Sequence, residues 1–242
     1  MKALTTISSV VLLLLTGNNV MADMKMNDNP VTTMLYAQGI EYRDGIGNSN
    51  GGDQVVWDDV RLRIGRDLNK IELRSNGEAS DGKVESANAS LLYSRAVLPY
   101  WDLQIGWRHD FKPEPERDWF TVGLSGIAPY EFHSDLFLSV GKSGRLDLEL
   151  EFERDYLITQ RWVIAPRIEA NLSSKDDFET GVGKGLTELE LGLRLRYRIS
   201  KKFAPYVGLN WIGHFGNTAD LIELAGEETR RWQWSAGFTG WY

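Results

Sequence analysis

The stretch "LTELELGLRLRYRIS", residues 186–200, decides the fold because its side chains form two alternating rows. The apolar row is Leu189, Leu191, Leu193, Leu195, Tyr197 and Ile199. The polar row is Glu188, Glu190, Gly192, Arg194, Arg196 and Arg198. A helix would spread both rows around its axis, whereas a strand separates them onto two faces. The period of two therefore predicts a β-strand with one apolar and one charged face.

The same alternation recurs along the chain, for example in "WDLQIGWRHD" at 101–110 and "RLDLELEFERDY" at 145–156. It predicts about twelve strands, near residues 34–44, 54–66, 69–78, 82–97, 99–111, 117–127, 129–141, 145–155, 160–173, 185–200, 202–214 and 229–242. Most reach the ~9–11 residues that a tilted strand needs to cross a bilayer. Short connections alternate with mostly longer ones, as in outer-membrane barrels.

These features predict an all-β fold, a transmembrane antiparallel up-and-down β-barrel over residues 34–242. A mean hydropathy of −0.32 fits such a barrel, because only every second residue faces lipid. The location expected is the outer membrane of a Gram-negative cell, with outer-membrane lipid around the apolar rows. A net charge of −7 without a basic patch gives no indication of nucleic-acid binding.

The N-terminal residues predict export. Lys2, the apolar run 10–15 and "VMA" ending at Ala22 form a Sec-type signal peptide over residues 1–22, cleaved after Ala22. Residues 23–33 are then a short methionine-containing tail. The sequence has no cysteine, which excludes a disulfide framework and a lipoprotein anchor. At the other end, Tyr242 closes an aromatic pattern that resembles the sequence by which the barrel-assembly machinery recognises its substrates.

With the apolar rows toward lipid, the charged rows predict a charge network in the lumen. Its predicted members are Arg61, Arg63, Asp147, Glu149, Glu151, Glu153, Arg167, Glu169, Glu188, Glu190, Arg194, Arg196 and Arg198. Acidic and basic rows on neighbouring strands can pair across the sheet. Such a network either fills and stiffens a narrow barrel or lines a selective polar path, and both interpretations stay open.

Three other interpretations compete. A soluble lipocalin-like barrel would turn the apolar rows inward. An outer-membrane lipid hydrolase would need a serine near a histidine, but Ser125 in "GLSGI" misses the G-x-S-x-G elbow by one position, so no enzyme is predicted. A small-solute channel is the main alternative function, although wide pores have sixteen or more strands.

Long segments of the chain resemble the copper resistance protein B family, from about Trp57 to Tyr242. They include "LYSRA", "PYWDLQ", "RHDF", "LELGLRLRYRI" and "FAPYVG". The resemblance implies an outer-membrane protein that binds copper weakly and aids its sequestration or export from the periplasm. It also implies periplasmic copper-handling partners, with a multicopper oxidase as one candidate. Family members often carry a Met/His-rich segment before the barrel, whereas here it is reduced to "DMKMNDNPVTTM" without histidine, which argues against a high-capacity copper store.

All five methionines of the chain lie within its first 34 residues. Met24, Met26 and Met34 would remain after cleavage, and thioether sulfur suits Cu(I). His109, followed by acidic residues in "RHDFKPEPE", is a candidate for Cu(II). It shares the lipid-facing parity of Trp107, however, which favours an aromatic role at the membrane interface. The other histidines, His133 and His214, have no metal-motif spacing and are predicted on the lumen side and at the outer rim.

Overall fold

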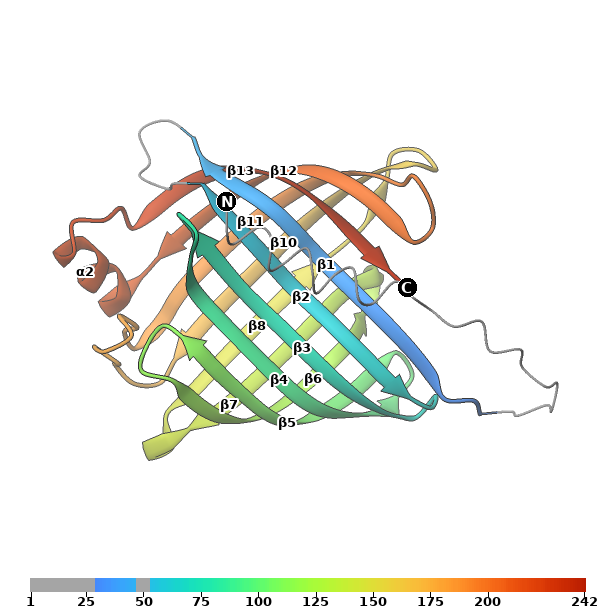
Figure 1. The fold of residues 1–242 in the computed structure, drawn as a ribbon, viewed down its shortest axis with the longest axis horizontal. Helices are drawn as coiled ribbons and strands as arrows, with labels where there is room; N and C mark the ends of the chain where they lie inside the picture. The colour runs from blue at the N-terminus through green and yellow to red at the C-terminus, as the bar shows by residue number, and fades with distance from the viewer. Residues whose placement is uncertain (1–28, 47–52) are drawn as a thin grey trace. The chain divides into compact units, whose positions relative to one another are not determined.

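The computed structural model describes residues 29–46 and 53–242, so the predicted signal peptide and Met24 and Met26 lie outside the described residues. Twelve long strands form the wall (Figure 1). They are β1 Thr32–Gly45, β2 Gln54–Gly65, β3 Asn69–Ser80, β4 Lys83–Leu98, β5 Trp101–Lys112, β6 Arg117–Ala128, β7 Phe132–Gly141, β8 Leu146–Glu153, β10 Trp162–Ser173, β11 Gly185–Tyr197, β12 Phe203–His214 and β13 Arg230–Trp241. A two-residue strand, β9 (Tyr156–Leu157), adds to the edge of β10.

The sheet closes on itself. Each long strand pairs antiparallel with the next one along the chain, and β13 pairs with β1 in the register Glu41 opposite Gly237. This closure removes every free edge among the long strands, as a wall in lipid requires. The predicted twelve-stranded up-and-down barrel is confirmed.

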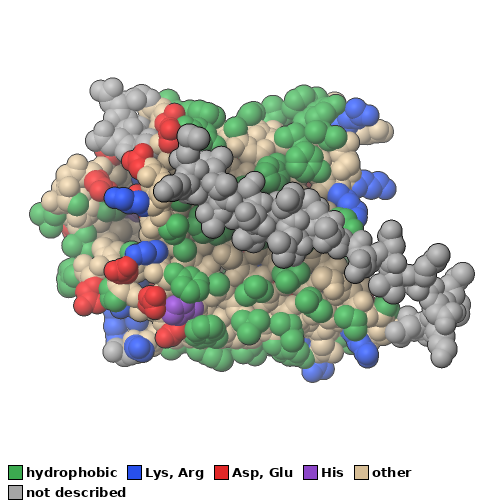
Figure 2. Space-filling model, viewed as in Figure 1, with side chains coloured by type: hydrophobic (Ala, Val, Ile, Leu, Met, Phe, Trp, Pro, Cys, Tyr) green, Lys and Arg blue, Asp and Glu red, His purple; other side chains and the backbone are tan. Residues whose placement is uncertain are grey.

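The side chains point as the alternation predicts. On β11, Leu191 and Leu193 are exposed on the outer surface, whereas Glu190, Arg194 and Arg196 are buried inside the barrel. Figure 2 shows apolar side chains spread over the wall and charged ones gathered toward its two ends. The apolar face is therefore the lipid face, and the lipocalin-like alternative is wrong.

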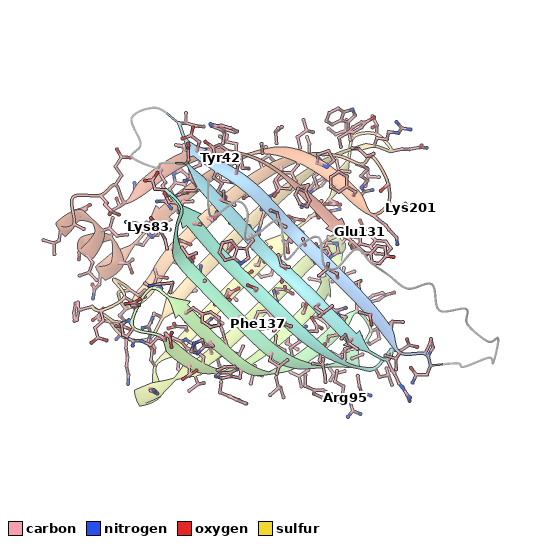
Figure 3. All side chains as sticks on the ribbon, viewed as in Figure 1. Tyr42, Lys83, Arg95, Glu131, Phe137 and Lys201 are labelled. Atoms are coloured by element: carbon pink, nitrogen blue, oxygen red, sulfur yellow. The ribbon has the colours of Figure 1, made fainter. Side chains whose placement is uncertain are left out.

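The two ends of the barrel differ in their connections. The turn end carries the short connections, and there the backbones of Leu35 and Tyr242 exchange two hydrogen bonds of 2.8 Å. The loop end carries the longer segments 174–184 and 215–229. In Figure 3, Arg95 and Lys201 lie at the turn end and Lys83 at the loop end.

Some local structure differs from the sequence prediction. The segment 215–229, expected to be a loop, contains a helix, α2 (Gly216–Leu224). Two one-turn 3-10 helices, η1 (Pro129–Glu131) and η2 (Lys142–Gly144), also precede β7 and β8. None of the helices in the described part of the chain is long and apolar enough to cross a membrane.

Candidate functional site in the barrel lumen

Two β-bulges shape the interior of the barrel. In β1 the pairing with β13 shifts between Ala37 and Ile40, and in β2 the pairing with β3 shifts between Trp57 and Val60. At the second bulge Asp59 adopts a φ of 45°. A bulge inserts one residue and so reverses the facing of the strand beyond it. As a result, the consecutive residues Asp58 and Asp59 both reach the lumen, where each forms ion pairs.

A layer of paired charges crosses the middle of the lumen, and we call it the septum. It consists of Gln38, Glu41, Arg43, Asp58, Asp59, Arg61, Arg74, Asp135, Glu151, Arg167, Glu190 and Arg194. These side chains come from β1, β2 and β3 on one side of the barrel and from β7, β8, β10 and β11 on the other, so the septum ties the two sides together.

Arg167 is the most highly connected cation of the septum. Its side chain is 3% exposed and places Nη1 2.8 Å from Asp58, Nε 2.8 Å from Glu151 and Nη2 2.8 Å from Glu169. The Gln38 amide donates to the same Glu151 carboxylate at 2.5 Å. These acceptors offset the cost of burying the Arg167 guanidinium.

Two further groups complete the septum. Asp135 accepts from Arg61 at 2.7 Å and from Arg74 at 3.0 Å, and both arginines also pair with Asp59. Arg43 lies between Glu41 at 2.5 Å and Glu190 at 2.9 Å. The Tyr206 hydroxyl donates to Glu41 at 2.7 Å.

The septum divides the lumen into two cavities. The loop-end vestibule has a volume of about 600 Å³ and the turn-end vestibule about 560 Å³. Among the described residues, Glu151 alone lines both. A polar solute entering from either end therefore meets paired charges before it reaches the other end.

The predicted charge network lies where the alternation places it. Asp147, Glu149, Glu169 and Glu188 line the loop-end vestibule, together with Glu190 and Arg167. Arg61, Arg63, Glu153 and Arg196 line the turn-end vestibule, where Arg198 pairs with Asp155 at 2.8 Å. The sequence prediction missed Glu41, Arg43, Asp58, Asp59, Arg74 and Asp135, which complete the septum. Glu41, Arg43, Asp58 and Asp59 lie at or beyond the two bulges, which the sequence does not reveal, whereas Arg74 and Asp135 lie on regularly paired parts of β3 and β7 and follow the alternation.

The structure separates the two described candidates for copper binding. Met34 lines the turn-end vestibule. His109 lies near the loop end on the outer face, where its ring is 4.5 Å from that of Phe111 and its Nδ1 is 2.8 Å from Asp118. These two residues cannot share one metal ion.

The other two histidines also lie apart from each other. His133 lines the turn-end vestibule, and His214 lines the loop-end vestibule with its Nδ1 3.6 Å from Glu188. In the described part of the chain, no group of three or more His, Cys, Asp or Glu is arranged to hold a metal ion.

The serine and histidine required for a lipid hydrolase lie at different positions along the barrel. Ser125 is opposite Asp102 near the turn end of the β5–β6 pair, whereas His109 is opposite Asp118 near its loop end. Seven residues of strand separate the two positions, roughly 23 Å at the rise of a β-strand. They do not form a catalytic pair.

A roof over the loop-end vestibule is formed by segment 174–184 and α2. Thr180 and Thr218 line the cavity, and the Gly183 amide donates to the Thr218 hydroxyl at 2.9 Å. Asp177 clamps the roof to the barrel by accepting from Arg117 at 2.9 Å and Arg145 at 2.6 Å. Burial raises the pKa of Asp177, but these partners outweigh that effect and hold the pKa below its ordinary value. The clamp is therefore ionised at neutral pH.

A model described as "Copper resistance protein B precursor (CopB)" matches residues 32–242, which is the whole described barrel. The chain belongs to the copper resistance protein B family. This confirms the resemblance found in the sequence and extends it to β1, whose residues form part of the septum.

Two relatives in the copper resistance protein B family cover most of the chain. "Copper resistance protein B" of Escherichia coli is 38% identical over 217 residues, 90% of this chain and 72% of that protein. "Copper resistance protein B homolog" of Pseudomonas syringae pv. tomato (strain ATCC BAA-871 / DC3000) is 34% identical over 218 residues, with the same two coverages. Among solved structures, the NanC porin is similar with a TM-score of 0.51 and 14% identity, covering 86% of this chain and 99% of that one. At that identity the similarity shows the outer-membrane barrel fold alone.

Proposed function

We propose that this barrel supports copper resistance by binding copper weakly at its turn end and aiding its sequestration or export from the periplasm. The observation that carries the proposal is the match of the whole barrel to the copper resistance protein B family. Met34 supports it, because this thioether lies on the wall of the turn-end vestibule, directly after the tail that holds Met24 and Met26.

The proposed order of events begins in the tail. Met24 and Met26 capture Cu(I) in the periplasm, since thioether sulfur is a soft ligand. Met34 and His133 are then separate contact points inside the turn-end vestibule, on β1 and β7. A periplasmic multicopper oxidase is a candidate partner at this end, and no catalytic step is assigned to the barrel itself.

We expect the double variant Met24→Ser/Met26→Ser to bind Cu(I) several-fold more weakly than the wild-type protein, because it loses two of three thioether sulfurs. The measurement is competition with a chromophoric Cu(I) chelator, using the mature protein in detergent. Thr32→Ser/Thr33→Ser, at the end of the tail where β1 begins, is the matched control and leaves the affinity unchanged. Equal affinities of the methionine variant and the wild type would remove the tail from the proposal.

A small-solute channel is the second candidate, favoured by the two vestibules that enter the lumen from opposite ends. The septum stands against it, because its charges are paired and buried. A large ohmic conductance of the wild-type barrel in planar bilayers, unchanged by copper, would favour the channel over the copper-binding proposal.

A further inference from the structure

The two ends of the barrel differ in the charge of their connections. The turn 198–202 between β11 and β12 contains three basic residues and no acidic one, whereas segment 215–229 at the loop end contains four acidic residues and no basic one. On the face shown in Figure 2, basic side chains project from the turn end and acidic ones lie at the loop end. The turn 198–202 is therefore a local concentration of positive charge on a chain whose net charge is −7.

Three cations at this end have no acidic partner. Arg161, Lys201 and Lys202 are exposed, and none of them forms an ion pair within 4.0 Å among the described residues. Figure 3 shows Lys201 at the turn end of the wall. The neighbouring Arg198 differs, because it pairs at 2.8 Å with Asp155, which lines the turn-end vestibule. The three unpaired cations are therefore available to an anion from outside the barrel.

Backbone hydrogen bonds hold the three cations on neighbouring parts of the wall. The Arg198 amide donates to the Arg161 carbonyl at 2.8 Å, which fixes the start of β10 beside the turn 198–202. Trp241 joins the same turn to the end of β13, because its amide donates to the Lys202 carbonyl and its indole Nε1 to the Lys201 carbonyl, both at 3.0 Å. Two interstrand spacings, about 10 Å, separate β10 from β12. The long basic side chains can therefore converge on one anion.

Aromatic side chains hold two of these cations at the outer rim of the barrel. Arg161 Nη1 donates to the hydroxyl of Tyr197, a member of the outward apolar row of β11, at 3.2 Å. Lys202 Nζ lies 4.9 Å from the ring centroids of both Trp241 and Tyr242, and both rings are exposed. Tyrosine and tryptophan rings favour the boundary between hydrocarbon and lipid headgroups. The two cations are thus placed at the depth of the headgroups.

We propose that Arg161, Lys201 and Lys202 form a binding site for the anionic headgroup of a phospholipid in the periplasmic leaflet. The short turns of an outer-membrane barrel face the periplasm, so the site meets the headgroups of that leaflet. Clustered Lys and Arg side chains attract anionic headgroups. Ile199 and Phe203, on either side of the turn, are exposed and continue the site onto the hydrocarbon. An acidic protein would contact the cations without using this apolar surface, which favours a lipid.

The test is titration of the mature protein in nonionic detergent with dioleoylphosphatidylglycerol, which is anionic, or with dioleoylphosphatidylethanolamine, which is zwitterionic. Native mass spectrometry measures the affinity for the first bound lipid. The wild type is expected to bind phosphatidylglycerol several-fold more tightly than phosphatidylethanolamine. Each Lys or Arg near a membrane surface contributes roughly fivefold in affinity, so Arg161→Gln/Lys201→Gln/Lys202→Gln is expected to weaken phosphatidylglycerol binding by about tenfold or more. Its affinity for phosphatidylethanolamine is expected to stay unchanged.

The matched control is Lys83→Gln/Lys142→Gln/Lys184→Gln, which removes three exposed cations from the loop end and is expected to bind phosphatidylglycerol like the wild type. Circular dichroism checks that both variants are folded. An unchanged phosphatidylglycerol affinity in the turn-end variant, or an equal loss in the control, would overturn the inference. Tighter binding of a soluble poly-glutamate peptide than of phosphatidylglycerol would also overturn it, because the surface would then fit an acidic protein. Copper is absent, so the result is independent of the proposed function.

Discussion

Replacing Arg167 with methionine is expected to lower the free energy of unfolding by about 3–5 kcal/mol, the range for breaking a buried ion pair by removing one partner. The variant keeps much of the side-chain volume but leaves Asp58, Glu151 and Glu169 without their shared cation. Because all three contacts are 2.8 Å long and the arginine is 3% exposed, water cannot easily replace it. The measurement is reversible urea unfolding in lipid vesicles.

Arg95→Met is the control for this prediction. Arg95 is exposed at the turn end (Figure 3) and forms no ion pair within 4.0 Å among the described residues, so its loss changes the free energy of unfolding little. If Arg167→Met had the same free energy of unfolding as Arg95→Met, the ion pairs of the septum would not contribute to the stability of the barrel.

Leu191→Arg is expected to destabilise the barrel by about 2–4 kcal/mol, the range for an arginine on the lipid face at the bilayer midplane. Leu191 is the central residue of β11, is exposed on the outer face and lies opposite Ile168 and Trp211 on the neighbouring strands. A charge at this depth has no water and no partner within the apolar surface. The same vesicle-unfolding measurement applies.

Ile199→Arg is the matched control, since Ile199 belongs to the same apolar row but lies beyond the turn end of β11. Near the interface the expected loss is only about 0–1 kcal/mol. Equal losses at the two positions would mean that depth in the membrane does not decide stability, and that the apolar row does not face hydrocarbon.

Most of the fold could be predicted from the sequence because every long strand of the barrel has the same alternation of outward apolar and inward polar side chains. The alternation of Leu191 and Leu193 with Glu190 and Arg194 predicts a strand and also predicts which side chains point outward. Shifting the strand by one residue would turn its charged side chains toward lipid, so only one register is stable. Strand boundaries followed from the connections, with the largest errors, about three residues, at the start of β7 and the end of β11, and the two-residue strand β9 was not predicted.

The helix α2 was not predicted because it lies in a short segment without strong amphipathic periodicity. Its place is set by tertiary contacts, in which Thr218 is buried and receives a hydrogen bond from the Gly183 amide. Such a contact between segments far apart in the chain cannot be inferred from local pattern.

The candidate site was predictable only in part. Charges on strands with clean alternation, such as Glu151 and Arg167, were identified as lumen residues from parity alone. Asp58 and Asp59 were not, because the bulge between Trp57 and Val60 breaks the parity on which the prediction depends. The contacts of Arg194 with Glu41, Asp58 and Glu153 depend on three other strands, which no pattern within β11 encodes.

Survival on copper-containing medium tests the proposed role of the lumen most directly. A strain that lacks this protein would be complemented with the wild type or with Met34→Ser/His133→Ala, which removes the two proposed copper contacts of the turn-end vestibule. The account predicts that the wild type restores survival and that the variant, folded and present in the outer membrane at the same level, does not. Equal survival with both proteins would contradict the account.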